Sequence, residues 1–341
     1  MQVQKDFSLK KFNTFGIDAS AEYFSTFFII DELKSILESN KKIKSKMILG
    51  GGSNILFTKD FDGLVLKNEI SGMNIVEEDE NYVYVKAGGG VKWHNLVMFC
   101  VRQNLGGLEN LSLIPGNVGA SPMQNIGAYG VEIKDVFHEL EAFHLKEKEL
   151  LVFSADDCRF GYRDSVFKNK YKNEFAVLNV TYRLRKNPVF NISYGALELE
   201  LGKMNVTDLT VKAVSDAVIN IRSLKLPDPA IIGNAGSFFK NPVINSHQLY
   251  EIHRLHEYEE KDVPYYKIDE INFKIPAGWL IEKCGWKGYR KDDAGCYEKQ
   301  ALVLVNYGNA TGQEIYDLSE EIKISVKEKF GIELEREVNI V

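Results

Sequence analysis

The sequence predicts an α+β protein of two or three domains. Its 341 residues are 45% hydrophobic and 26% charged, so the chain can bury a large core and fill more than one domain. Strand and helix signals alternate at the N-terminal end, β signals dominate the middle, and both kinds return after a proline-rich break. This order favours α/β and mainly antiparallel layers that occupy separate parts of the chain.

The first part of the chain is predicted to be a small α/β lobe. Apolar strand signals alternate with amphipathic helix signals, and two of the strands run directly into glycines. Within the first seventy residues we expect strands at residues 21–30 and 46–49 and a helix at residues 32–39 with Asp31 as its N-cap. A further strand at residues 82–87, which ends in Gly88-Gly89-Gly90, and a helix at residues 91–103 then repeat the order of strand, glycines and helix.

The middle of the chain predicts a mainly antiparallel lobe, because apolar alternation runs through residues 140–144, 150–153 and 175–185. A helix at residues 211–223 then leads to Leu226-Pro227-Asp228-Pro229, where two prolines end regular structure and mark a domain boundary. Beyond it we expect a helix at 277–283, a strand at 301–306, a long helix with a Thr311/Glu314 capping box and Gly331 as its C-terminal cap, and a strand at 335–341.

Charge and cysteine content exclude several classes of protein. The formal net charge of -6 gives no basic field for a nucleic acid, so an anionic ligand must meet a local cluster of Lys and Arg. No CxxC pair occurs, so we expect neither a metal site nor a disulfide framework from Cys100, Cys158, Cys284 and Cys296. The longest apolar stretch, residues 23–30, is too short to span a bilayer, and we expect no targeting or membrane segment.

Two glycine-rich segments are candidates for binding a phosphate or a flat ring. Residues 50–54, Gly-Gly-Gly-Ser-Asn, follow a predicted strand and offer backbone N–H groups without side chains in the way. They form neither GxGxxG nor a Walker A loop, so a tight turn without a ligand is an equal alternative. Residues 114–130 are also dense in glycine and small residues, and they fit either a compact connection or backbone wrapped around a cofactor.

Single polar residues, each taken alone, do not identify a functional site. Arg163 alone fits a surface ion pair, Ser237 beside two phenylalanines fits an ordinary strand, and Glu337 lies in a charge run typical of a solvated face. No GxSxG elbow surrounds Ser237 and no histidine can be assigned to it, so a hydrolase triad is not supported.

Taken together and in this order, the motifs resemble the UDP-N-acetylenolpyruvoylglucosamine reductase family. The resemblance runs nearly end to end, and residues 193–195 and 247–273 resemble its longer type I form. It implies two lobes that hold FAD non-covalently in the fold of the vanillyl-alcohol oxidase/PCMH type, and a C-terminal α+β substrate domain. The implied domains are residues 1–71 joined by 331–341, residues 72–226, and residues 227–330. The motifs that carry the resemblance are residues 50–54, 114–130, 162–165, 226–229, 234–242, 277–281 and 337–338.

The resemblance implies a reaction in peptidoglycan precursor synthesis. NADPH reduces the flavin, and the reduced flavin N5 then passes hydride to the enolpyruvyl group of UDP-N-acetylglucosamine enolpyruvate, which gives UDP-N-acetylmuramate. It also implies a monomer in the bacterial cytoplasm with no nucleic-acid or membrane partner.

The resemblance also assigns roles to residues. Arg163 would hold the substrate carboxylate, Ser237 would protonate the enolate carbon, and Glu337 would lie beside that carboxylate, protonated or bridged by Arg163 because two carboxylates repel. For Lys240 and Arg222, a diphosphate contact and a solvated charge remain equal alternatives. The implied FAD residues are Gly50, Gly51, Gly52, Ser53, Asn54, Pro115, Gly116, Gly119, Ala120, Gln124, Asn125, Gly127, Ala128 and Tyr129, the last of which could equally be packing. The implied substrate residues are Tyr194, Lys225, Asn241, Tyr266 and Gln300.

Two rival functions remain open at this point. The first is another flavoenzyme on the same scaffold, such as an alcohol oxidase, in which FAD is often tethered through His or Cys. The second is a catalytically silent protein that binds a nucleotide sugar, although the presence of Arg163, Ser237 and Glu337 argues against it.

Overall fold

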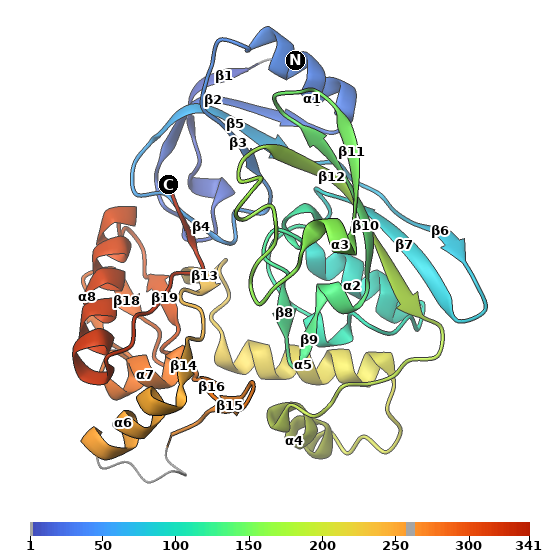
Figure 1. Cartoon of the computed structure of the whole chain (residues 1–341). Helices are drawn as coiled ribbons and strands as arrows, with labels where there is room; N and C mark the ends of the chain where they lie inside the picture. The colour runs from blue at the N-terminus through green and yellow to red at the C-terminus, as the bar shows by residue number, and fades with distance from the viewer. Residues whose placement is uncertain (1–2, 257–262) are drawn as a thin grey trace. The chain divides into compact units, whose positions relative to one another are not determined.

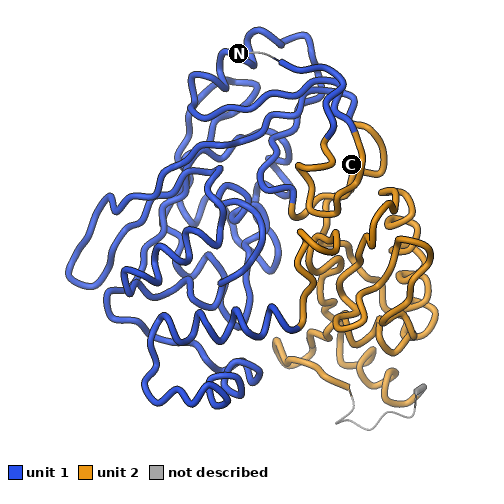
Figure 2. The backbone as a smooth tube through the Cα atoms, turned by 180° about the vertical axis from the view of Figure 1, so that it is seen from behind, with its two compact units in different colours: residues 1–8, 20–52, 61–224 blue, residues 9–19, 53–60, 225–341 orange. Residues whose placement is uncertain are grey.

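The chain divides into two compact units in the computed structural model, which describes residues 3–256 and 263–341. Unit 1 consists of residues 1–8, 20–52 and 61–224, and unit 2 of residues 9–19, 53–60 and 225–341 (Figure 2). The chain therefore passes between the units several times, and two short N-terminal segments belong to the C-terminal unit. The three predicted domains remain a prediction.

A four-stranded sheet and one helix form the first layer of unit 1. Strands β2, β5 and β3 are parallel and β1 is antiparallel to β2, in the order β1-β2-β5-β3. Helix α1 buries Leu33, Ile36 and Leu37 against this sheet, as its amphipathic pattern predicts. The elements are β1 (Gln4–Ser8), β2 (Ser20–Phe27), α1 (Ile30–Ser39), β3 (Lys46–Leu49) and β5 (Phe61–Asn68).

The predicted N-cap of α1 is wrong. The helix begins at Ile30 with Ile29 as its N-cap, and Asp31 lies inside the first turn. The Glu32 carboxylate reaches back and accepts the Phe28 N–H at 2.7 Å, so a carboxylate one residue further on satisfies the backbone that precedes the helix.

An antiparallel sheet in the order β11-β10-β12-β7-β6 forms the second layer of unit 1 (Figure 1). Helix α2 buries Trp93, Leu96 and Cys100 in the same core as the inward residues of β7 and β12, which explains the apolar alternation of those strands. Helices α4 and α5 form a smaller cluster around Leu197 and Val218. The elements are β6 (Met73–Glu78), β7 (Tyr82–Gly88), α2 (Trp93–Arg102), β10 (Phe137–His144), β11 (Leu150–Ser154), β12 (Phe175–Arg185), α4 (Gly195–Lys203) and α5 (Val211–Lys225).

Unit 2 is built on a sheet in the order β13-β19-β18-β17, and α8 packs on β18 and β19. The capping box of α8 is confirmed: the Thr311 hydroxyl accepts the Glu314 N–H, and the Glu314 carboxylate accepts the Thr311 N–H at 2.7 Å. Gly331 ends the helix in the predicted left-handed conformation, at φ 67°. The elements are β13 (Gly233–Ser237), α7 (Ala277–Lys283), β17 (Arg290–Lys291), β18 (Ala294–Cys296), β19 (Val303–Asn306) and α8 (Gly312–Phe330).

The predicted C-terminal strand is not continuous. Arg336 forms an isolated bridge with Phe239, and only β20 (Asn339–Ile340) is a strand, parallel to β4 (Ile55–Leu56). The segment changes partner between these points, so it cannot follow one strand throughout. A three-stranded sheet, β14-β16-β15, and helix α6 complete unit 2. They consist of β14 (Val243–Asn245), α6 (Ser246–His256), β15 (Tyr266–Lys267) and β16 (Asn272–Lys274), and residues 257–262 of the predicted type I stretch lie outside the described residues.

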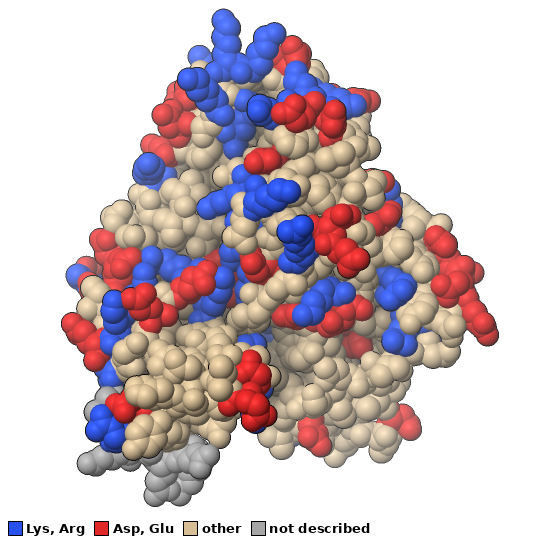
Figure 3. Space-filling model, in the orientation of Figure 1, with Lys and Arg blue, Asp and Glu red and all other residues tan. Residues whose placement is uncertain are grey.

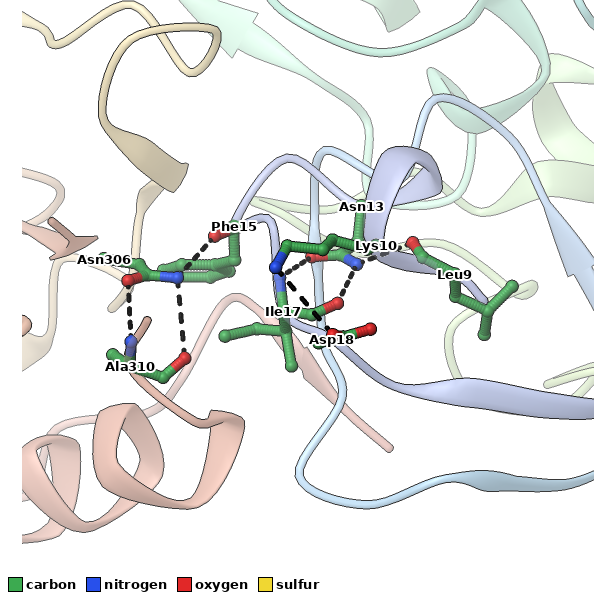
Figure 4. Close-up of polar contacts among 8 residues, drawn as sticks. All are labelled: Leu9, Lys10, Asn13, Phe15, Ile17, Asp18, Asn306 and Ala310. Atoms are coloured by element: carbon green, nitrogen blue, oxygen red, sulfur yellow. Dashed lines mark hydrogen bonds and ion pairs between the residues drawn. The ribbon is translucent and has the colours of Figure 1, made fainter. Parts of the chain in front are cut away.

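Two buried asparagines hold residues 9–19 in place: Asn13 closes the segment on itself, and Asn306 joins it to the rest of unit 2 (Figure 4). The Asn13 amide donates to the carbonyls of Leu9 at 2.9 Å and Ile17 at 3.0 Å, which closes this segment into a compact turn. The Asn306 amide donates to Phe15 O at 3.0 Å, and its carbonyl accepts the Ala310 N–H at 3.0 Å. One side chain at the end of β19 therefore holds both the N-terminal segment and the turn before α8.

Among residues 3–256 and 263–341, no helix is long and apolar enough to cross a bilayer. Within the same part of the chain, no group of three or more His, Cys, Asp or Glu side chains is arranged to hold a metal ion.

We predict that Asn306→Ala lowers the free energy of unfolding by about 2–3 kcal/mol, because it leaves buried backbone groups without hydrogen bonds. Asn309→Ala is the matched control, since Asn309 is exposed and should change stability by less than about 0.5 kcal/mol. Urea unfolding followed by tryptophan fluorescence measures both variants. Equal midpoints for the two would contradict the role given to Asn306.

Candidate functional site

The two predicted glycine segments meet in unit 1. A Cβ built on Gly51 would lie 2.8 Å from the Cα of Gly116 and 2.9 Å from Oδ1 of Asn117, so only glycine fits. Gly116 itself has φ +108°, a conformation that favours glycine. Backbone from residues 50–52, after β3, therefore lies directly against backbone from residues 115–120.

A third glycine run holds the other side of the same loop. Gly119 donates its N–H to Gly89 O at 2.9 Å, and a Cβ on Gly119 would lie 3.0 Å from that oxygen. A Cβ on Gly89 would lie 2.4 Å from the carbonyl oxygen of Val177 in β12. The loop after residue 115 is thus clamped between the β3 turn and the end of β7. The sequence shows the glycines at 88–90 directly after a predicted strand, but it does not indicate this role.

This arrangement fits an FAD diphosphate and ring system. Close backbone approach without intervening side chains suits a diphosphate and an isoalloxazine. Pro115 and Ala120 are exposed beside it, whereas Gly119 is buried. The predicted cofactor residues from 50 to 52 and from 115 to 120 are therefore brought together.

Asn125 has a structural part in this loop. It is fully buried, and its amide donates to Glu132 and to the carbonyl of Gly161, both at 3.0 Å. Its carbonyl accepts the Lys134 N–H at 3.1 Å. The side chain thus ties the glycine loop to the segment that carries Arg163, a function that the glycine pattern alone did not indicate.

A hydrogen bond to the Gly127 carbonyl positions the Arg163 side chain. Its Nη2 donates to Gly127 O at 2.6 Å, and a Cβ on Gly127 would lie 3.1 Å from the Arg163 Nη1. Arg163 also has φ 53°, in the left-handed region that non-glycine residues seldom adopt. The half-buried guanidinium is therefore held at the edge of the glycine loop, next to β8 (Gly127–Ala128).

Arg222 and two tyrosines complete this corner of unit 1. The half-buried Arg222 interacts with the charge of Arg163, and its guanidinium donates to the Tyr129 hydroxyl. Burial lowers the pKa of Arg222 and raises that of Tyr129, because each charged form is poorly solvated there. The Tyr129 ring meets Tyr194 edge-on at 5.3 Å between centroids. Arg222 is thus held by protein partners at this corner.

Ser237 and Glu337 lie on neighbouring segments of unit 2. The Glu337 N–H donates to the carbonyl of Phe238 at 2.9 Å, so the C-terminal segment runs beside the residue that follows Ser237. Ser237 ends β13 just after a bulge, where Gly236 has φ +70° and donates to the Asn234 side chain at 2.9 Å. The buried Asn234 therefore shapes the turn that presents Ser237.

The end of the first glycine segment contacts the same C-terminal segment. The Asn54 amide donates to Glu337 O at 3.3 Å, and the Asn339 N–H donates to Asn54 O at 3.2 Å. Ser53 and Asn54 belong to unit 2, although residues 50–52 belong to unit 1.

Two predicted substrate residues converge at the start of α7. The Asn241 Oδ1 accepts the Ala277 N–H at 2.9 Å, and a Cβ on Gly278 would lie 2.9 Å from Oε1 of Gln300. The other predicted substrate residues of unit 2 are spread out: Lys225 is exposed at the end of α5, and Tyr266 is exposed on β15.

Lys240 has a partner that sequence analysis did not foresee. Its Nζ contacts the Glu335 carboxylate at 2.5 Å, and its side chain is largely buried. The Lys240 N–H also donates to Glu335 O at 2.9 Å. An ion pair therefore holds this lysine on the paired C-terminal segment.

Basic and acidic side chains are interspersed over most of the molecular face in Figure 3, in keeping with the net charge of -6. An anionic ligand must therefore be met by local groups such as Arg163 and Arg222.

Family models match both parts of the chain. The model described as FAD binding domain matches residues 30–149, and the one described as UDP-N-acetylenolpyruvoylglucosamine reductase, C-terminal domain, matches residues 228–341. The first match covers both glycine segments, and the second covers Ser237 and Glu337.

Curated relatives match the chain from end to end. The chain is 50% identical to UDP-N-acetylenolpyruvoylglucosamine reductase from Flavobacterium johnsoniae, with 100% of each chain covered. It is 47% identical to the enzyme of that name from Amoebophilus asiaticus, again over 100% of both chains.

A solved structure supports the fold. The chain superposes on UDP-N-acetylenolpyruvylglucosamine reductase from Thermus caldophilus with a TM-score of 0.67 and 23% identity, covering 100% of this chain and 99% of that one. The chain therefore belongs to the UDP-N-acetylenolpyruvoylglucosamine reductase family, as an FAD-dependent oxidoreductase of peptidoglycan precursor synthesis that joins an FAD-binding domain to the C-terminal domain of that family.

Proposed function

We propose that the chain reduces UDP-N-acetylglucosamine enolpyruvate to UDP-N-acetylmuramate, with NADPH as the electron donor. The observation that carries the proposal is the pairing of the Ser237 and Glu337 segments in a chain whose family reduces this enol ether. The chemistry that bound FAD supplies is hydride transfer, from NADPH to the flavin and from flavin N5 to the terminal enolpyruvyl carbon.

Arg163 binds the substrate carboxylate in this proposal. Hydride addition to the terminal carbon moves negative charge into the adjacent carbon and its carboxylate. A guanidinium stays protonated and can hold both carboxylate oxygens, so it stabilises this charge as it develops. The bond from Arg163 to Gly127 O supports the role, because it fixes the cation before the substrate arrives.

Ser237 donates the proton to the enolate carbon, and Glu337 lies close to the substrate carboxylate. A serine hydroxyl is a weak acid, so the step requires a water-poor site and rapid reprotonation of the alkoxide by a neighbour. Glu337, which is half-buried, must be protonated or bridged by Arg163, because two bare carboxylates repel each other.

The remaining residues bind the nucleotide sugar. The convergence of Asn241 and Gln300 at α7 supports a contact with the sugar nucleotide, and Lys225 supplies positive charge for the diphosphate. Tyr194 and the exposed Tyr266 are aromatic contacts of the type I form, to which we assign the chain on the basis of residues 193–195 and 247–273.

The purified protein should be yellow, bleach under anaerobic conditions when NADPH is added, and regain its colour when the enolpyruvyl sugar follows. Absorbance near the flavin band during this titration measures both half-reactions. Denaturation should release free FAD, whereas colour in the precipitate would favour a tethered flavoenzyme. Bleaching without recovery on adding substrate would overturn the proposal and favour a protein that only binds the nucleotide sugar.

We predict that Ser237→Ala lowers kcat by on the order of 10²- to 10⁴-fold, the range of a lost general acid. Bleaching by NADPH should stay within about 2-fold of the wild-type rate, because the proton is needed only after hydride reaches the substrate. Ser246→Ala, an exposed serine at the start of α6, is the control. Normal turnover by Ser237→Ala would remove Ser237 as the proton donor.

A further inference from the structure

His94 makes a specific hydrogen bond to the start of the glycine loop. It lies in the first turn of α2, and its Nδ1 accepts the N–H of Leu113 at 2.9 Å. Because the nitrogen accepts, it must be unprotonated, so the bond exists only with neutral imidazole. The residue is half-buried, and sequence analysis did not single it out.

Leu113 is in an unfavourable backbone conformation. Its φ of 58° is left-handed, which a leucine adopts only when its surroundings impose it. Its side chain is 36% exposed. The bond from its N–H to His94 is a local interaction that holds the strained residue, directly before Ile114 and the glycine loop.

The carbonyl of the same residue holds a cation. The Leu113 C=O accepts the Arg222 Nε–H at 3.3 Å, and the rest of that guanidinium reaches the Tyr129 hydroxyl and the charge of Arg163. His94, Leu113 and Arg222 thus form a chain of contacts from α2 to the arginine pair. The N–H and the C=O of Leu113 lie on either side of its φ and ψ angles. Loss of the bond to His94 therefore lets these angles relax, and the carbonyl oxygen that positions Arg222 then moves.

We propose that His94 is a positioning residue that, through the left-handed Leu113, holds Arg222 beside Tyr129 and Arg163. The inference rests on the proposed function, in which Arg163 binds the substrate carboxylate. Arg222 then adds a second positive charge where the enolate charge develops. His94 touches neither substrate nor cofactor in this account.

The positioning requires the neutral form of His94. Arg222, from α5, is the charged group that acts on it, and Arg163 and Tyr129 lie beyond Arg222 on the loops. Burial and the nearby Arg222 lower the pKa of His94 below the ordinary value of about 6.5, so the acceptor nitrogen is free at neutral pH. As pH falls through this lowered pKa, the ring gains a proton and the bond to Leu113 is lost.

A second histidine provides a matched control. His144, at the end of β10, also accepts backbone N–H groups through Nδ1, from Lys146 at 3.2 Å and Glu147 at 3.0 Å. That turn joins β10 to β11 and contains no proposed site residue. The same substitution at both positions separates a local turn effect from an effect on Arg222.

The experiment compares His94→Asn, His94→Phe and His144→Asn as FAD-loaded enzymes between about pH 5 and pH 8, the range in which histidine titrates. His94→Phe should slow reoxidation of the flavin by the enolpyruvyl sugar about 3- to 10-fold, the effect of one lost hydrogen bond, while NADPH bleaching changes little. His94→Asn places an amide oxygen near the Nδ1 position. This variant should keep most of the rate of flavin reoxidation. As pH decreases, its rate should lose the part of the fall that protonation of His94 causes in the wild type.

The proposal fails if His94→Phe reoxidises at the wild-type rate. It also fails if both half-reactions and FAD affinity fall together, since that outcome marks a merely structural residue. A pH profile of His94→Asn that matches the wild-type profile contradicts the role of the neutral imidazole. His144→Asn should match the wild type throughout. If the flavin of the wild-type protein is not reoxidised by the enolpyruvyl sugar, the proposed function itself is contradicted. This outcome distinguishes failure of the proposed function from failure of the role of His94.

Discussion

The direct contact of glycine backbones in unit 1 is the constraint on which the rest of the candidate site depends. Gly51 lies against Gly116, and Gly119 lies against Gly89, so three turns that follow separate elements of the sequence share one small volume. A side chain at any of these positions would need the space that another backbone fills. The dense glycine pattern, which in sequence could equally mark a simple turn, is explained by this mutual approach.

In unit 2, backbone pairing of the C-terminal segment positions the candidate site residues. The C-terminal segment pairs with residues 238–240 and then with β4, so the last residues of the chain border Ser237 on one side and Asn54 on the other. The site residues of this unit are therefore positioned mainly by backbone hydrogen bonds, which explains how Glu337 can lie in a charge run and still have a defined place. Its neighbour Arg336 contacts Glu320 on α8, which fixes the segment further.

The sequence predicts well those features whose cause is local. Helix α7 and strand β12 have their predicted bounds, and the capping box at Thr311 forms because both partners lie within one turn. The strand expected at 335–341 is interrupted because its partners come from two distant segments, which no local pattern reveals.

The sequence identifies some residues of the candidate site and misses others. Its glycine segments and Ser237 carry motifs, so the sequence identifies them as a set. The parts it missed act through tertiary contacts: Asn125 ties two loops together, and His94 reaches a leucine nineteen positions away through a single backbone N–H. A histidine at the start of a helix after three glycines was a weak signal, because only the fold shows what lies opposite it.

The most direct test of this account is the affinity of the apoprotein for FAD, measured by isothermal titration calorimetry in Gly51→Ala and in Gly202→Ala. A methyl group at Gly51 would meet Gly116 and Asn117, whereas one at Gly202 in α4 meets no atom within 4 Å. The account predicts that Gly51→Ala weakens FAD binding by on the order of 10-fold or more while Gly202→Ala binds as the wild type does. Wild-type affinity in Gly51→Ala would contradict it.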